Sequence, residues 1–143
     1  MPNLNDGPTV LLRPIHTAGA FLLLVHAASA PLQAQVTTEA GRYLVYFDEF
    51  SANLTPDAQK VIAEAAAKAK ESGAKTVRIE GRASATGSPE ANRLLTQTRT
   101  QVVSDELAKD GISPTIIQQQ ALGQTTTTDA SVMDRRVDVV LLK

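Results

Sequence analysis

Residues 78–99 read RIEGRASATGSPEANRLLTQTR and pass from a strand pattern, through a loop with a glycine near each end, into a helix start. Apolar and polar residues alternate over residues 74–81, which predicts a strand with one buried and one polar face. Ser88 followed by Pro89 predicts a helix start, because the serine side chain caps the first turn and proline needs no hydrogen bond there. The stretch therefore predicts a strand, a loop and a helix in that order.

The helix after Pro89 is predicted to run to Gly111 with one stripe of residues against a sheet. The stripe is predicted to comprise Ala91, Leu94, Leu95, Thr98, Val102 and Leu107. Arg99 lies in line with its apolar members, and a cation on the buried side of a helix needs an anion. Its planar side chain projects towards the loop and suits a carboxylate. That anion is either a ligand carboxylate or an internal salt bridge to Asp48, Glu49 or Asp134, and the sequence leaves both open.

The other elements extend this pattern in both directions. Residues 42–47, RYLVYF, predict a buried first strand, and Thr55 and Pro56 predict the start of a helix that ends at Gly73. Two more strands are predicted, over residues 116–122 and through 137–141. The order strand, helix, strand, helix, strand, strand predicts an α/β (α+β) fold: a two-layer sandwich with a mixed sheet and both helices on one face.

The N-terminus has the layout of a secretory signal. The apolar run AGAFLLLVHAASA, residues 18–30, follows Arg13 and precedes small residues, and it is too short for a membrane-spanning helix. We expect a signal peptide over 1–34 cleaved after Ala34, a short linker over 35–41 and a domain over 42–143. Cleavage after Ala30, an uncleaved N-terminal anchor and a disordered N-terminus are the alternatives. Export predicts a periplasmic protein, either free or associated with the outer membrane.

Composition excludes several function classes. The formal net charge of -1 lacks the excess of basic residues typical of nucleic-acid binders. The chain has no cysteine, and its two histidines, His16 and His26, lie ahead of the predicted domain. Thiolate chemistry is therefore excluded and imidazole chemistry is not expected in the domain. No spacing of serines or carboxylates suggests catalysis, so we expect no enzyme activity, metal or cofactor.

The loop over residues 81–88 joins a strand end to a helix N-terminus, where backbone amides and the helix dipole attract anions. A loop that only turns the chain would look the same. Arg135 and Arg136, at the entry of the last strand, either add positive potential here or are solvated strand-end residues.

A set of motifs gives these features a family context. They are VYFDEFSANLTPDAQ (45–59), IEGRASATGS (79–88), the spaced Asn92, Leu95 and Arg99, GI (111–112), ALG (121–123) and DRRVDV (134–139). With these motifs, the chain from about Tyr43 to Leu142 resembles the OmpA-like peptidoglycan-binding domains of Gram-negative envelope proteins. Within that resemblance, Asn92 is expected to support the loop or the helix.

The resemblance implies non-covalent binding of the peptidoglycan stem peptide. In the family, the helix arginine and loop amides hold the diaminopimelate carboxylate, and a loop aspartate holds its ammonium. The arginine corresponds to Arg99, but the aspartate position is Ser84 and the preceding threonine position is Ala83. A serine lacks the charge, so we expect affinity to fall about tenfold or more. The expected ligand-binding residues are Arg99, Ser84, Asp48, Ala83 and Arg135.

Two functions follow from this departure. The first is weak binding of peptidoglycan in the cell envelope. The second is a degenerate domain that acts as a structural or protein-interaction module, with other envelope proteins as partners.

Overall fold

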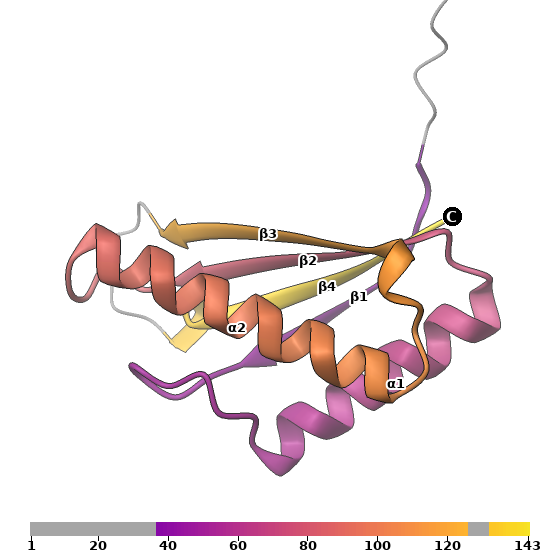
Figure 1. Ribbon diagram of the computed structural model, residues 1–143, viewed down its shortest axis with the longest axis horizontal. Helices are drawn as coiled ribbons and strands as arrows, with labels where there is room; N and C mark the ends of the chain where they lie inside the picture. Colours follow the sequence, from indigo (N-terminus) through magenta and orange to yellow (C-terminus); the bar gives the residue numbers. More distant parts are fainter. Residues whose placement is uncertain (1–36, 126–131) are drawn as a thin grey trace, which may run out of the picture. The chain divides into compact units, whose positions relative to one another are not determined.

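The computed structural model describes residues 37–125 and 132–143. The expected signal peptide and most of the threonine run after Thr125 lie outside the described residues. The elements are, in order, β1 (Glu39–Tyr46), α1 (Pro56–Ser72), β2 (Thr76–Ala83), α2 (Pro89–Lys109), the 3-10 turn η1 (Pro114–Ile116), β3 (Ile117–Gln124), the 3-10 turn η2 (Val132–Asp134) and β4 (Arg136–Leu142) (Figure 1). This order confirms the predicted succession of strands and helices.

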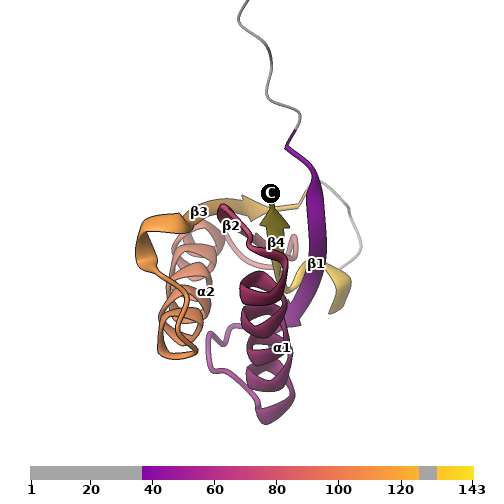
Figure 2. The same cartoon turned by 90° about the vertical axis from the view of Figure 1, so that its right-hand side faces the viewer.

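The strands form a mixed sheet in the order β1-β4-β2-β3. Strand β4 is antiparallel to both β1 and β2, whereas β2 and β3 are parallel and joined by α2. Both helices cover the same face of the sheet, as the end-on view shows (Figure 2). The predicted two-layer sandwich with two helices on one face is therefore confirmed.

Local capping explains where the helices begin. The side-chain oxygen of Thr55 accepts a 3.1 Å hydrogen bond from the amide of Ala58, and Ser88 does the same for Ala91 at 3.1 Å. A proline follows each cap, at a position where its missing amide hydrogen costs nothing. Helix α1 ends at Gly73, whose φ of 63° suits a residue without a side chain. These starts and this stop agree with the sequence signals.

The prediction that the first strand is buried is wrong. Strand β1 lies at the edge of the sheet, and Val45 is its one fully buried residue. Strand β4 is one of the two inner strands, because it lies between β1 and β2. Its residues Val137, Val139, Val140 and Leu141 have no exposed surface. Sequence composition shows which strands are apolar but does not show which of them pairs on both sides.

The predicted stripe on α2 is also largely wrong. The buried residues of this helix are Asn92, Thr96, Arg99, Thr100, Val103, Ser104 and Leu107, whereas Ala91, Leu94 and Thr98 are exposed. The reason is a close approach between α2 and β2 at Gly81. A Cβ atom on Gly81 would lie 2.7 Å from Cγ2 of Thr100 and 3.1 Å from the main-chain oxygen of Thr96. Small polar residues fit this contact, where leucines would not.

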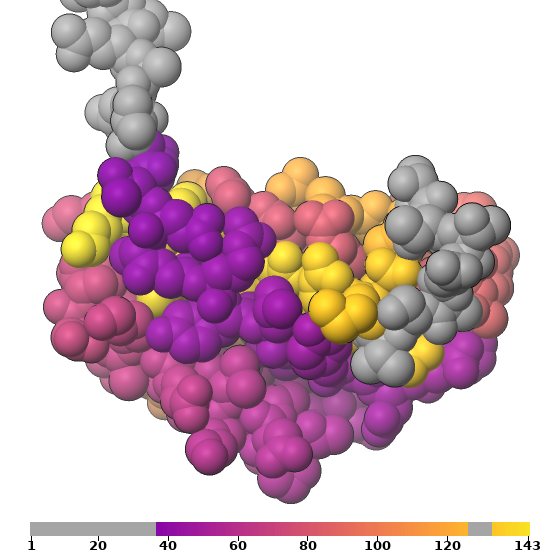
Figure 3. Space-filling model, turned by 180° about the vertical axis from the view of Figure 1, so that it is seen from behind, coloured from indigo at the N-terminus to yellow at the C-terminus, as the bar shows by residue number. Residues whose placement is uncertain are grey.

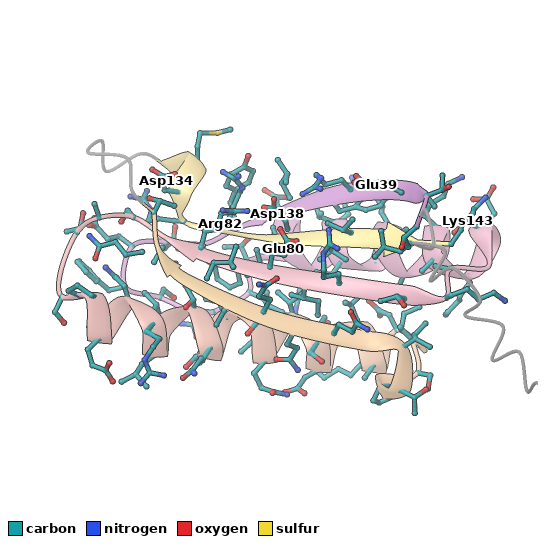
Figure 4. All side chains as sticks on the ribbon, turned by 90° about the horizontal axis from the view of Figure 1, so that it is seen from above. Glu39, Glu80, Arg82, Asp134, Asp138 and Lys143 are labelled. Atoms are coloured by element: carbon teal, nitrogen blue, oxygen red, sulfur yellow. The ribbon has the colours of Figure 1, made fainter. Side chains whose placement is uncertain are left out.

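Two carboxylates on β2 and β4 are each clamped between arginines. Glu80 forms ion pairs with Arg78 and Arg82 at 2.7 and 3.4 Å. Asp138, which faces Glu80 in the strand register, pairs with Arg42 and Arg136 at 3.1 and 2.7 Å. Glu80, Arg82 and Asp138 lie close together in Figure 4, and the view from behind shows atoms of β1 and β4 at the surface (Figure 3). These arginines, Arg42, Arg78, Arg82 and Arg136, therefore already have anionic partners.

Candidate functional site

A tight turn follows β1 and carries the first part of the site. The amide of Ser51 donates a 3.2 Å hydrogen bond to the main-chain oxygen of Asp48, and Phe50 has a φ of 53°. A positive φ is unusual for a bulky residue and marks a backbone held by its surroundings. We call Asp48–Ser51 the β1–α1 turn.

Arg99 holds this turn from α2. Its side chain has no exposed surface, Nε donates to the main-chain oxygen of Ser51 at 2.8 Å, and Nη2 donates to that of Asp48 at 2.8 Å. The guanidinium carbon also lies 5.1 Å from the centre of the Phe47 ring, a cation–π distance. Within residues 37–125 and 132–143, Arg99 makes no ion pair, so the alternative of an internal salt bridge is wrong.

The remaining nitrogen of Arg99 has no partner. Nη1 is buried and makes no hydrogen bond, and the same holds for Nε of Arg135. Burial, and secondly the charge of Arg135, lower the pKa of Arg99 to about 10, so the guanidinium is still charged at neutral pH. A buried cation with an unused donor beside a second cation is costly unless an anion joins them.

Ion pairing distinguishes these two arginines from the others in the described part of the chain. Five arginines form ion pairs with carboxylates, namely Arg42, Arg78, Arg82, Arg93 and Arg136, whereas Arg99 and Arg135 form none. The two unpaired arginines line the same small pocket. The described arginines without an ion pair therefore lie at one place.

The loop between β2 and α2 closes the other side of the pocket. Nδ2 of Asn92 donates to the main-chain oxygens of Ser84 and Thr86 at 3.1 and 2.9 Å, and Nε2 of Gln124 donates to that of Ala85 at 2.9 Å. The buried Asn92 therefore supports the loop, as the sequence predicted. Because its carbonyls are tied to neighbouring side chains, this loop presents a fixed backbone beside the helix N-terminus.

The pocket brings together four of the five residues expected from the sequence. Its lining consists of Glu49, Phe50, Ala83, Ser84, Asn92, Leu95, Arg99 and Arg135. In this conformation it has no room for a water-sized molecule. Asp48 contributes its main-chain oxygen to Arg99 but lines a different cleft, of about 430 Å³, that also holds Asp57 and Arg135.

Four lining residues were not expected in a binding role, namely Glu49, Phe50, Asn92 and Leu95. From the sequence, Glu49 was expected only as a salt-bridge partner for Arg99, and this pairing does not occur. Phe50 is 67% exposed and also borders an adjoining groove of about 320 Å³. That groove is mostly apolar and is lined by Phe50, Gly87, Ala91, Asn92, Leu94, Leu95 and Thr98. Leu94 was the sequence signal for this groove, but the predicted helix stripe assigned this leucine to the core.

In the described residues, no group of histidine, cysteine and carboxylate side chains is arranged to bind a metal ion. None of the helices found there is both long and apolar enough to cross a membrane. The pocket is lined by two arginines, Arg99 and Arg135, that each have a buried nitrogen without a hydrogen-bond partner.

Comparisons with known proteins agree on the fold. The model of the OmpA family matches residues 46–136. The OmpA-like domain of FopA1 from Francisella tularensis is similar, with a TM-score of 0.64 and 20% identity over 76% of this chain and 82% of that one. The peptidoglycan-associated lipoprotein from Burkholderia pseudomallei gives a TM-score of 0.63 and 23% identity over 71% and 90% of the two chains.

The C-terminal domain of Helicobacter pylori MotB is similar at a TM-score of 0.59 and 14% identity, covering 70% of this chain and 83% of that domain. At such identities these likenesses show the fold alone. No match was found among curated proteins.

Proposed function

Because the chain belongs to the OmpA family, we propose that it is a cell-envelope protein that binds peptidoglycan non-covalently, through the diaminopimelate residue of a stem peptide. A structural neighbour bears the name peptidoglycan-associated lipoprotein, and another is a periplasmic domain of MotB. We place the mature protein in the periplasm, free or associated with the outer membrane. The proposal is for a binding protein without catalysis, metal or cofactor.

One observation carries the proposal. Arg99 is fully buried, charged at neutral pH and bound only to main-chain oxygens, with Nη1 left without a partner next to Arg135. A ligand carboxylate that accepts from Nη1 would supply the anion that no described side chain supplies. The fixed loop before α2 adds backbone amides and the positive end of the helix dipole on the same side.

Weak binding follows from two features of the pocket. Ser84 is neutral where the family has an acid, which removes a charged contact and weakens binding by about tenfold. The pocket also has no free volume in this conformation, so its lining has to open before a ligand reaches the guanidinium. The adjoining groove lies next to the same residues and offers apolar surface to the alanine methyl groups of a stem peptide.

Co-sedimentation with purified sacculi tests the proposal. We expect the wild-type protein to sediment with sacculi, and Arg99→Ala and Arg135→Gln each to reduce the bound fraction at least fivefold. Arg93→Ala is the matched control, because Arg93 lies on the same helix, is exposed and pairs with Glu90 at 2.7 Å. Circular dichroism checks that each variant is folded. A wild-type protein that stays in the supernatant would refute the proposal.

A second function is favoured by a specific observation. The pocket has no room for a ligand in this conformation, and both hydrogen bonds of Arg99 stabilise the β1–α1 turn. A domain whose arginine serves only the turn would be a structural or protein-interaction module. In that case sacculi would not bind the protein, and the groove bordered by Phe50 and Leu94 would be the surface to examine for an envelope partner.

A further inference from the structure

One acidic residue lines the pocket in the described part of the chain, and it comes from an unexpected element. Glu49, in the β1–α1 turn, lines the pocket together with Ser84 and Arg99. Ser84 itself is buried and neutral. The acid is thus contributed by a turn that follows β1, whereas the family resemblance placed it in the loop that follows β2.

The carboxylate of Glu49 is available to a ligand. It is exposed, and it makes no hydrogen bond or ion pair with any described residue, although Arg99 and Arg135 line the same pocket. Glu90 pairs with Arg93 and Glu80 with Arg78, whereas Asp48 lines a different cleft. Glu49 is therefore the acidic group that a ligand cation in this pocket would meet.

The position of Glu49 is fixed by the same arginine that would bind the ligand anion. The main-chain oxygens of Asp48 and Ser51, on either side of Glu49 and Phe50, both accept from Arg99 at 2.8 Å. A Cβ on Gly87 would lie 3.9 Å from Cε1 of Phe50, so the turn reaches the loop before α2. This anchoring ties the main chain on either side of Glu49 to the guanidinium whose Nη1 has no partner.

We propose that Glu49 recognises the ammonium group of the ligand and takes the place of the acid that is absent at Ser84. The inference rests on the proposed function and makes it more specific. The site then carries complementary groups for a carbon that bears both a carboxylate and an ammonium: Arg99 for the first and Glu49 for the second. Discrimination between stem peptides would depend on the β1–α1 turn.

Three N-acetylated stem tripeptides separate the two contacts. Their third residue is meso-diaminopimelate, 2-aminopimelate, which lacks the side-chain amine, or lysine, which lacks the side-chain carboxylate. Calorimetric titration of the purified protein should show that Glu49→Gln lowers the affinity for the diaminopimelate peptide about tenfold, the value expected for a lost charged contact. The 2-aminopimelate peptide should bind the variant and the wild type equally.

Two further variants complete the design. Glu90→Gln makes the same chemical change at an exposed glutamate of α2, and it should leave all three affinities unchanged. Adding Ser84→Asp to Glu49→Gln should restore at least half of the lost binding free energy, because the acid returns from the other loop.

The outcomes separate a failure of the proposed function from a failure of the role of Glu49. A wild-type protein that binds none of the peptides overturns the proposed function. Diaminopimelate binding that is unchanged in Glu49→Gln, or lost equally for the 2-aminopimelate peptide, overturns the role of Glu49 and leaves the proposed function standing.

Discussion

Nε of Arg99 donates a 2.8 Å hydrogen bond to the main-chain oxygen of Ser51, so a side chain of α2 fixes the turn that follows β1. The two residues are 48 positions apart in the chain. The guanidinium thus has a structural task, for which it uses Nε and Nη2, while its third nitrogen, Nη1, has no partner. Loss of Arg99 should consequently affect both stability and binding.

Arg99→Ala should lower the free energy of unfolding by about 2–4 kcal/mol, because two main-chain oxygens lose a charged donor and a cavity forms beside Phe47. Urea denaturation followed by circular dichroism measures this change. Arg93→Ala, at an exposed position of the same helix, should change stability by less than about 0.5 kcal/mol. Equal effects of the two substitutions would show that the buried hydrogen bonds contribute little.

Gly81→Ala should destabilise the fold by about 1–3 kcal/mol, because the new methyl group overlaps with Thr100 and approaches the main chain at Thr96. Adding Thr100→Ser removes the methyl group at 2.7 Å and should recover part of the loss. Gly41→Ala is the control, since its nearest neighbour is a side-chain atom of Tyr43 at 3.3 Å. Thermal unfolding of the four proteins tests the close approach of α2 and β2.

Asn92→Ala should lower the free energy of unfolding by about 1–3 kcal/mol, because main-chain oxygens of the loop before α2 lose their donor. Hydrogen exchange of the amides in residues 84–88 should become faster. The exchange rates of the β4 amides should change only as far as global stability changes. Thr98→Ala, exposed on the same helix, should leave the exchange of the loop as it is. Unchanged exchange in Asn92→Ala would mean that the loop is held by other contacts.

Binding of the N-acetylated 2-aminopimelate peptide should depend on pH through Arg99. The pKa of Arg99 is lowered to about 10, and the carboxylate binds only the protonated guanidinium. Affinity should therefore be constant from pH 7 to about 9 and fall as the pH rises through about 10. This peptide has no side-chain amine, so the ligand itself does not titrate there.

Calorimetric titrations at fixed ionic strength measure this profile. Affinity that stays constant to pH 11 would mean that Arg99 does not contact the carboxylate. A parallel denaturation curve at each pH shows whether the fold is intact.

Local signals were sufficient for much of the fold. The pairs Thr55–Pro56 and Ser88–Pro89 begin helices because capping depends on residues within one turn. The alternation in β2 likewise gave the buried face of that strand, and its burial pattern agrees. The topology could also be predicted, because alternating strands and helices allow few ways to connect the strands of a sheet.

Properties set by distant residues were not predictable. Strand β1 is only partly buried, because β4, from the other end of the chain, takes the inner position beside it and leaves β1 at the edge. The face of α2 that is buried depends on its contact with Gly81, which no helical periodicity reveals.

In the site, Arg99 was found because a cation among apolar residues is conspicuous in sequence. Glu49 was missed as a pocket residue because its position depends on Phe50, whose positive φ has no local signal in a residue other than glycine.

The central claim is that Nη1 of the buried Arg99 receives the carboxylate of the ligand. The most direct test is to follow the ¹⁵N side-chain resonances of Arg99 while the diaminopimelate tripeptide is added to the purified protein. The account predicts saturable shifts of the Arg99 signals and of the loop amides at 83–88, with those of Arg93 unchanged. Peptide binding that leaves the Arg99 resonances in place would contradict it.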